Sequence, residues 1–116
     1  MAVELRPSQA LRLLQDFTFT LVTDGEPDLS ARQLSILLTI YLQPPPHTVR
    51  GLTGRLKVTK PVITRALDTM GKLGLVARRR DSADRRNVVI QRTPKGALAV
   101  ERLGDLLIAK ARELPR

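Results

Sequence analysis

The fold of this chain is decided by the stretch Thr59–Arg86, TKPVITRALDTMGKLGLVARRRDSADRR, which predicts one helix followed by a basic hairpin. Thr59 is a suitable N-cap, Pro61 falls in the first turn, where its missing N–H costs nothing, and Gly74 can end the helix in the left-handed conformation. Between these signals, apolar residues recur at i, i+4 and i+7, namely Ile63, Leu67 and Met70. One face of the helix is therefore predicted to enter a hydrophobic core.

The opposite face of this helix is polar and mostly cationic. Its members are Lys60, Thr64, Arg65, Asp68 and Lys72. Arg65 can donate two parallel hydrogen bonds to a guanine edge, and Thr64 offers a hydroxyl and a methyl group to base edges. Lys60 and Lys72 are expected to contact phosphates, and Thr59 with the first turn around Pro61 presents the favourable end of the helix dipole to a phosphate. The pattern indicates a helix for a DNA major groove.

Positive charge is concentrated in the middle of the chain. The 116 residues carry a formal net charge of +9. Residues 50–96 hold 13 Lys and Arg against 3 Asp and Glu, a net of +10, and the remaining residues hold 7 against 8, a net of −1. This distribution predicts a nucleic-acid-binding surface flanked by near-neutral helices that have another task.

Length and residue content limit the possible functions. A chain of 116 residues is expected to form a single domain, residues 1–116, around one core. The absence of cysteine excludes disulfides, thiolate metal sites and thiol redox chemistry. One histidine, His47, stands beside three prolines as an expected loop residue, and the carboxylates are not clustered. The sequence therefore predicts no enzyme, no metal site and no cofactor.

The N-terminal sequence gives no sign of export. It alternates charged and apolar residues, without the basic start, apolar run and small-residue cleavage site of a secretion signal. No apolar run approaches the length of a membrane span. We expect a cytoplasmic protein with access to the nucleoid and no membrane association.

Two helices are predicted before the central stretch. The first, residues 8–22, has Ser8 as a possible cap and carries two apolar stripes, which either pack in its own core or contact a second subunit. The second opens with a capping box, Ser30-x-x-Gln33, and must end at the prolines of residues 44–46. Its many apolar residues predict the most buried helix of the fold.

The elements around the central helix complete a winged helix-turn-helix. Thr48 can cap a short helix that a brief turn joins to the one beginning at Thr59, which is the helix-turn-helix arrangement. Residues 75–79 and 87–92 predict two strands around a polar tip, and Thr93 with Pro94 opens a last helix. The expected fold is mainly α with a small β-hairpin wing (α+β): residues 29–93 form the DNA-binding lobe, and helices at 8–22 and 94–114 serve dimerisation.

The wing and its exit resemble a known family. The segment Asp84–Gly96, DRRNVVIQRTPKG, is similar to the D-x-R-(x)5-L-T-x-x-G signature of the MarR-type (multiple antibiotic resistance regulator) winged-helix transcription factors. Residues 62–68, VITRALD, resemble the recognition helix of that family, and the likeness spans roughly residues 29–100. The resemblance implies that Thr64 and Arg65 read the major groove, and that Arg86, beside Arg85, enters the minor groove while Asp84 orients it.

Several alternatives remain open from the sequence. Asp84 and Arg86 could be a solvated turn pair, and residues 78–80, three arginines, could be surface residues or pair with Asp81. Two features depart from the family: Arg92 replaces an apolar residue at the end of the wing, and one helix rather than two follows Gly96. The dimer could therefore be smaller or differently arranged than in the family.

The predicted function is that of a sequence-specific DNA-binding transcriptional regulator, a repressor in this interpretation. It would bind double-stranded DNA at a pseudo-palindromic operator as a homodimer, with or without a small-molecule effector between the terminal helices and the lobe. The alternative is a winged-helix protein-interaction module acting on another regulator. A net charge of +10 on the central segment favours DNA, because an interaction module has no evident need for it.

Overall fold

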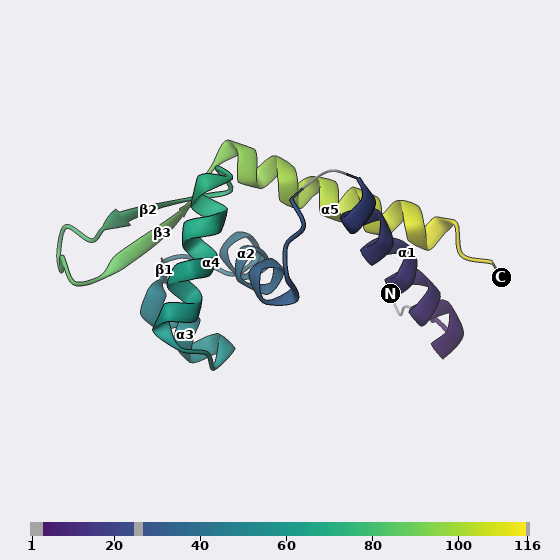
Figure 1. The fold of residues 1–116 in the computed structure, drawn as a ribbon, viewed down its shortest axis with the longest axis horizontal. Coiled ribbons are helices and arrows are strands. Elements are labelled where there is room, and N and C mark those ends of the chain that lie inside the picture. The colour runs from purple at the N-terminus through teal and green to yellow at the C-terminus, as the bar shows by residue number, and fades with distance from the viewer. Residues whose placement is uncertain (1–3, 25–26, 116) are drawn as a thin grey trace. The chain divides into compact units, whose positions relative to one another are not determined.

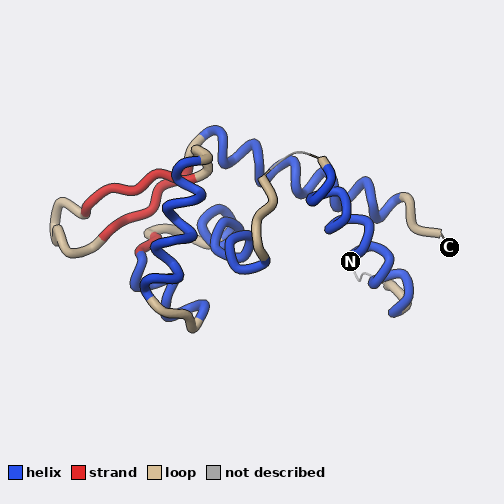
Figure 2. The backbone as a smooth tube through the Cα atoms, in the orientation of Figure 1, coloured by secondary structure: helices blue, strands red, loops and turns tan. Residues whose placement is uncertain are grey.

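The structure is a computed structural model that describes residues 4–24 and 27–115. Its contacts divide the chain into two compact units. The central unit is Leu29–Val100, and the terminal unit combines the segment up to Asp28 with the segment from Glu101 onward. Figure 1 labels the elements along the chain, and Figure 2 separates helices from strands.

The central unit contains three helices, a small sheet and the start of a fourth helix. Its elements are α2 (Ala31–Leu42), β1 (His47–Thr48), α3 (Val49–Leu56), α4 (Lys60–Lys72), β2 (Val76–Arg80), β3 (Val88–Arg92) and the first turns of α5 (Pro94–Arg112). The terminal unit holds α1 (Pro7–Thr23) and the rest of α5. This is the mainly helical winged fold that the sequence predicts.

The predicted caps of α2, α3 and α5 are confirmed. Ser30 Oγ accepts the Gln33 N–H at 3.1 Å while Gln33 Oε1 accepts the Ser30 N–H at 2.8 Å, so the capping box of α2 is complete. Thr48 Oγ1 accepts the Gly51 N–H at 3.0 Å at the start of α3. Thr93 Oγ1 does the same for Gly96 at the start of α5, at 2.9 Å.

Gly74 ends α4 in the way that the sequence predicts. Its φ is +77°, and its N–H donates to Gly71 O at 3.0 Å while the N–H of Leu75 donates to Met70 O at 2.9 Å. This pair of bonds is a Schellman motif, which satisfies carbonyls at the helix end and needs a residue that tolerates positive φ. The motif turns the chain directly from α4 into β2.

Two predictions about the helices are wrong in detail. Ser8 is not the cap of the first helix, because α1 begins one residue earlier, with Pro7 in its first turn. The most buried helix is α4, whose fully buried residues are Ile63, Ala66, Leu67 and Met70. The fully buried residues of α2 are fewer, Ile36, Leu37 and Ile40, while Leu42 stays 67% exposed. The apolar residues of α2 lie on more than one face, so part of them has no core to enter.

The sheet has one strand more than the predicted hairpin. Its order is β1-β3-β2 with antiparallel pairing, and β1 places His47 opposite Ile90 in β3. His47 is therefore a buried strand residue, 8% exposed, and not the predicted loop residue. Its Nε2 lies 3.1 Å from the carbonyl oxygen of Gln43. The short strand extends the sheet only at the root of the wing, where β3 adjoins α3.

The core of the central unit lies between α2, α3, α4 and the root of the sheet. Its largest fully buried side chains come from all three helices: Ile36, Leu37, Ile40, Leu52, Ile63, Leu67 and Met70. Leu75, Val76 and Ile90 close the core at the sheet. With α4 held on this core by one face, its other face remains free for a partner.

Candidate nucleic-acid interface

The exposed face of α4 begins at its cap. Thr59 occupies the N-cap position as predicted, but its side chain makes no capping hydrogen bond, and it is exposed together with Lys60 and Pro61. The carbonyl oxygen of Thr59 accepts the N–H of Val62 at 3.1 Å. The hydroxyl at this helix start therefore has no part in capping, and it lies next to a lysine at the positive end of the dipole.

Arg65 and Lys72 lie on the same side of α4, because seven residues make two helical turns. Both are exposed, whereas Thr64 is half-buried beside the core-facing row. The backbone oxygen of Arg65 accepts a hydrogen bond from the Thr69 hydroxyl at 3.2 Å. Arg65 and Lys72 are therefore both accessible to a partner on the same side of the helix.

An ion pair connects α4 with the wing. Arg78 Nη2 in β2 lies 2.6 Å from Asp68 Oδ1 in α4, with side chains that are 35% and 49% exposed. The predicted partner of the arginine run, Asp81, has a different task, since its Oδ1 accepts the Ala83 N–H at 2.9 Å in the turn of the wing. Of the two alternatives left open for residues 78–80, surface exposure holds for Arg79 and Arg80, whereas Arg78 pairs with α4 and not with Asp81.

The wing tip brings Asp84 and Arg86 together. Asp84 Oδ1 accepts the backbone N–H of Arg86 at 3.1 Å and lies 3.4 Å from its Nε. The Arg86 side chain is nevertheless 92% exposed. Arg85 is exposed as well, and its carbonyl oxygen accepts a hydrogen bond from Arg80 Nη1 at 3.0 Å. The turn therefore holds the base of Arg86 while its guanidinium projects into solvent.

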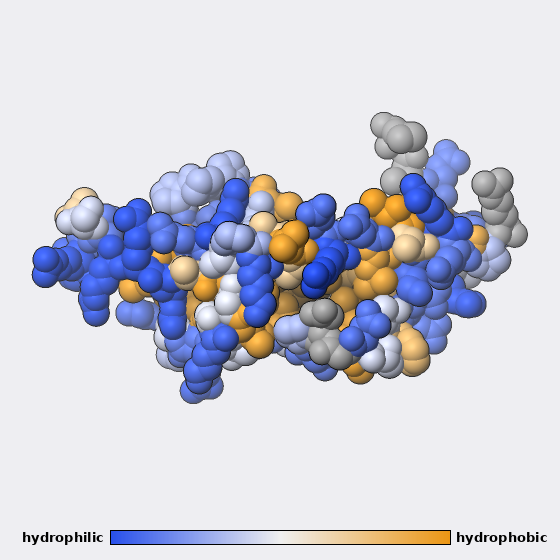
Figure 3. Space-filling view, turned by 90° about the horizontal axis from the view of Figure 1, so that it is seen from above, coloured by the Kyte–Doolittle hydropathy of each residue, from blue (hydrophilic) through white to orange (hydrophobic). Residues whose placement is uncertain are grey.

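The residues singled out in the sequence thus form two groups within the central unit. One lies along α4, from Thr59 to Lys72, and the other at the wing tip, from Asp84 to Arg86. The hairpin projects well away from the helices, so the two groups do not merge into one patch (Figure 1). In Figure 3 the end of the molecule that carries the wing is almost entirely hydrophilic. Two separated cationic groups fit two neighbouring grooves of a duplex.

Further exposed cations accompany these groups. Five such cations were not predicted as DNA contacts: Arg50, Arg55 and Lys57 on or after α3, and Arg79 and Arg80 on β2. Lys57 has φ +55°, a left-handed conformation that ends α3 in the turn before α4. Their only sequence signal was the basic excess of residues 50–96, which does not reveal which side chains share a surface.

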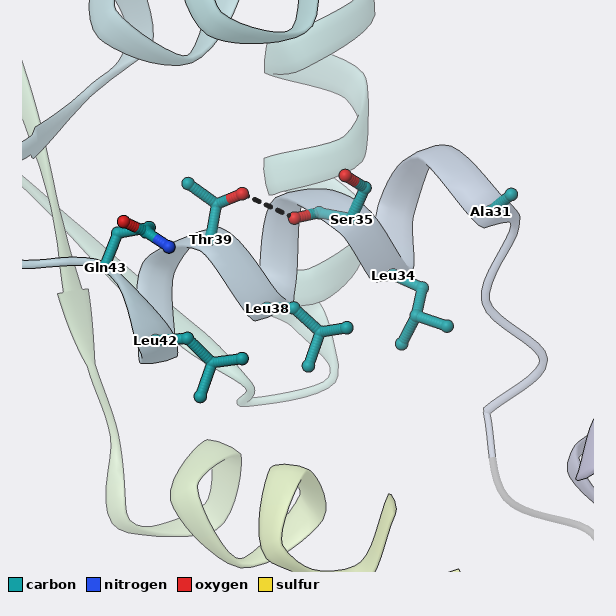
Figure 4. A pocket seen from close by; sticks show the side chains of 7 residues that line it. All are labelled: Ala31, Leu34, Ser35, Leu38, Thr39, Leu42 and Gln43. Carbon is teal, nitrogen blue, oxygen red and sulfur yellow. Dashed lines mark hydrogen bonds between the residues drawn. The ribbon is translucent and has the colours of Figure 1, made fainter. Parts of the chain in front are cut away.

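A shallow hollow lies along α2. Its volume is about 350 Å³. Seven residues line it: Ala31, Leu34, Ser35, Leu38, Thr39, Leu42 and Gln43. Figure 4 shows the three leucine side chains projecting from the same side of the helix. No charged side chain lines this hollow, so an occupant would be held by apolar contact.

The family model that matches this sequence is that of the MarR family, over residues 29–88. These 60 of 116 residues are just over half of the chain. The chain belongs to the MarR family. Both Asp84 and Arg86 fall within the matched residues, as does the whole of α4.

Solved MarR-type structures have the same fold over almost the whole chain. A single-substitution mutant of MepR from S. aureus is 22% identical, with a TM-score of 0.75 over 94% of this chain and 81% of that one. BldR from Sulfolobus solfataricus is 29% identical, with a TM-score of 0.66 over 95% of this chain and 84% of that one. The repressor CouR, solved bound to a 23-mer DNA duplex, is 24% identical, with a TM-score of 0.72 over 91% of this chain and 72% of that one.

Membership in the MarR family makes this chain a DNA-binding transcription regulator rather than an enzyme. A search of curated proteins returns no similar sequence. In the part of the chain that the structure describes, no helix is long and apolar enough to cross a membrane.

Proposed function

We propose that this MarR-family chain is a repressor that binds a pseudo-palindromic operator as a homodimer. The observation that carries the proposal is the pairing of a free cationic face on α4 with a wing whose arginine is held at its base and exposed at its end. A helix of this kind enters the major groove, and a projecting arginine is favoured in a narrow minor groove, where the DNA potential is most negative.

The α4 residues divide by chemistry into base readers and backbone contacts. Arg65 is the principal base reader, because its planar guanidinium donates two parallel bonds to guanine O6 and N7, and Thr64 supports it with a hydroxyl and a methyl group. Lys60 and Lys72 are point charges suited to phosphates. Thr59 and Pro61 form the helix start that faces a phosphate. Base readers determine sequence preference, whereas phosphate contacts add affinity to every sequence.

In the wing, Arg86 is the residue that enters the minor groove. Asp84 fixes its backbone and Nε, which reduces the conformational freedom that Arg86 loses on insertion. Arg85 stands beside it and meets the backbone of the same groove. Arg55 and Lys57 extend the phosphate-binding surface, since the first helix of a helix-turn-helix crosses the DNA backbone.

A homodimer is supported by the exposed apolar surface of the terminal unit. No residue of α1 is fully buried, and Leu11, Leu14, Phe19 and Val22 are all at least 59% exposed. Leu107 and Ile108 in α5 are 43% and 52% exposed. Of the two alternatives for α1, contact with a second subunit therefore explains the exposure, because soluble monomers rarely expose apolar surface on this scale. A dimer also supplies the second half-site that genomic specificity requires.

Repression follows if the operator overlaps a promoter, since a bound dimer then excludes polymerase. The related CouR is described as a transcriptional repressor and was solved on a DNA duplex. An effector could use the hollow on α2, whose lining suits an apolar small molecule. A promoter–reporter fusion, assayed with and without the protein, gives the sign of regulation directly.

The test of the DNA-binding mode compares Arg65→Ala with Lys72→Ala. The probes are a duplex selected from a random library by the unmodified protein and an unselected duplex of equal length. Arg65→Ala should weaken binding to the selected duplex by about 1–3 kcal/mol and relax its base preference. Lys72→Ala should weaken both duplexes similarly and lower the salt dependence by about one phosphate contact. Equal losses on both duplexes for both variants would show that Arg65 is not a base reader.

A further inference from the structure

We propose that the Asp68–Arg78 ion pair is a strut that fixes the wing relative to α4, so that the two residues position the DNA contacts without making them. This inference rests on the proposed DNA-binding function and deepens it. It assigns a role to the one acidic residue of α4, which the groove-reading model leaves unexplained.

The ion pair joins the helix that carries one group of predicted DNA-contact residues to the wing that carries the other. Asp68 belongs to the exposed side of α4, three residues after Arg65 and four before Lys72. Arg78 is the middle residue of β2 and pairs across the sheet with Ile90 of β3, which is 3% exposed. The 2.6 Å contact between Arg78 Nη2 and Asp68 Oδ1 therefore joins the helix surface to the wing just beyond the buried root of the sheet.

The outer part of the wing has little else to hold its direction. After Val76, every residue of β2 is exposed, and β1 pairs only with Val89 and Ile90 of β3. Arg80 and Val88 form the last pair of the β2–β3 ladder, and residues 81–87 beyond them form a turn. A hairpin end that no third strand pairs with is only marginally stable by itself. An arginine anchored to α4 limits the directions in which Arg86 can point before DNA arrives.

Without a partner, the carboxylate of Asp68 would be electrostatically unfavourable next to DNA. A carboxylate on the DNA-facing helix repels phosphates, so a bare Asp68 would reduce affinity for every duplex. An exposed ion pair of this kind also adds little to folding stability, which rules out fold maintenance as a sufficient reason. The role that remains for the ion pair is a geometric one. The pair neutralises Asp68 and lowers the conformational entropy that the wing loses on binding.

The first experiment measures binding of Asp68→Asn and Arg78→Gln to the selected and unselected duplexes. Each variant should lose about two- to fivefold in affinity for the selected duplex, because an unanchored wing must be ordered on binding and an exposed ion pair contributes no more than this. Asp68→Asn should lose nothing on the unselected duplex, since it removes a negative charge. Arg79→Gln is the matched control: it makes the same charge change one residue along β2, on the opposite face, and should weaken both duplexes alike.

Charge reversal separates the strut from direct base contact. Asp68→Arg and Arg78→Asp should each lose selectivity, and the two combined should regain most of it, because the pair is rebuilt with opposite sense at unchanged net charge. If Asp68 instead accepted a hydrogen bond from a cytosine edge, Asp68→Asn would change the preferred base and the combined reversal would not restore binding. That result would overturn the proposal.

The second experiment requires no DNA. The chain has no cysteine, so spin labels can be placed uniquely through Ser82→Cys at the exposed wing tip and Gly54→Cys on α3, where an added Cβ meets nothing within 4 Å. The distance distribution between the labels should broaden with Asp68→Asn, recover with the combined reversal and stay unchanged with Arg79→Gln. Melting curves by circular dichroism should be nearly the same for all variants.

The outcomes distinguish the strut from the proposed function. An unchanged distance distribution in Asp68→Asn refutes the strut whatever the binding data show. Higher affinity of Asp68→Asn for both duplexes also refutes it, since Asp68 would then be only a repelling charge. If the unmodified protein shows no preference for any duplex, the proposed function fails, while the spin-label distances still decide whether the ion pair orients the wing.

Discussion

At the residue scale, the start of α5 is joined to α2 and to the end of α4 by a compact polar junction. The Tyr41 hydroxyl donates to Leu75 O at 2.7 Å and accepts the Thr93 N–H at 2.9 Å. Thr93 Oγ1 donates to Gly74 O at 2.7 Å. These bonds satisfy backbone groups where three elements meet, which gives Tyr41 a structural role. The junction explains why the segment Thr93–Gly96 has a threonine at one end and a glycine at the other.

Gly96 is the residue at which this junction tolerates no side chain. A Cβ there would collide with the Tyr41 hydroxyl and with the carbonyl oxygen of Leu75, which is backbone and cannot move aside. We expect Gly96→Ala to lower the free energy of unfolding by about 1–3 kcal/mol, because it overpacks a close contact. Gly54→Ala, in α3 with no atom within 4 Å, should instead raise it by about 0.5–1 kcal/mol. Urea titration followed by circular dichroism measures both, and a stable Gly96→Ala variant would contradict the close approach.

At the scale of elements, the C-terminal end of α2 depends on a wing residue. The carbonyl oxygen of Ile40 would normally accept the N–H of residue 44, but this residue is a proline and has none. Arg92 at the end of β3 supplies the missing donors: Nε to Ile40 O at 2.8 Å and Nη2 to Gln43 O at 2.9 Å. Its guanidinium also lies 5.9 Å from the centroid of the Tyr41 ring. The departure of Arg92 from the family pattern therefore fixes the end of β3 and does not disturb it.

Removing the donors of Arg92 should destabilise the central unit. Arg92→Met keeps much of the aliphatic stem but leaves the carbonyls of Ile40 and Gln43 with fewer partners, so we expect a loss of about 1–3 kcal/mol in unfolding free energy. Arg79→Met, on the exposed part of β2, should change the free energy of unfolding by no more than about 0.5 kcal/mol. Thermal and urea unfolding provide the comparison. Equal stability of the two variants would mean that solvent satisfies the end of α2 without Arg92.

The wing is the second element whose role can be isolated, because its tip lies outside the core. Arg86→Ala should reduce affinity for the selected duplex by about 1–3 kcal/mol while helix content and melting temperature remain unchanged. Arg85→Ala is the matched neighbour and should weaken selected and unselected duplexes to a similar, smaller extent. Fluorescence anisotropy at two salt concentrations measures both variants. Full-strength binding by Arg86→Ala would remove the minor-groove contact from the model.

At the scale of the whole molecule, the net positive charge and the exposed apolar residues lie in different parts of the chain. The central segment of residues 50–96 carries all of the net positive charge, and the rest of the chain is near neutral. The terminal unit carries the exposed apolar residues of α1 and of the second half of α5. Two copies can therefore associate through their terminal helices without bringing two strongly basic surfaces together.

This division predicts how the chain assembles. Replacing Leu103 and Leu107 with Glu should give a monomer, because it places charges on the apolar face of α5 that a partner would cover. The monomer should still bind any duplex weakly but should lose tight binding to the operator. The reason is that a monomer reaches only one of two half-sites, whose centres lie about 10 base pairs apart.

Sedimentation equilibrium combined with the duplex assays provides the measurement for this double variant. Leu42→Glu, at a leucine of the central unit that is more exposed than Leu107, is the control and should leave the dimer intact. An unmodified chain that remains monomeric at micromolar concentration and still binds its selected duplex with full specificity would rule out the dimer model.

The sequence by itself determined the local structure of this protein. Caps at Ser30, Thr48 and Thr93, the left-handed Gly74 and the prolines after α2 are signals that act within a few residues, so the helix boundaries and the winged order of elements could be predicted. The basic segment also predicted a nucleic-acid-binding surface in the middle of the chain, because charge excess is a property of composition.

Only the tertiary structure decided which side chains meet across the fold. Arg92 contacts Ile40 from 52 positions away, and Arg78 pairs with Asp68 rather than with the nearer Asp81. Neither contact has a periodicity or a local motif, because each depends on how β2 and β3 are placed against α2 and α4. The third strand at His47 escaped prediction for the same reason: two residues become a strand only when β3 lies beside them.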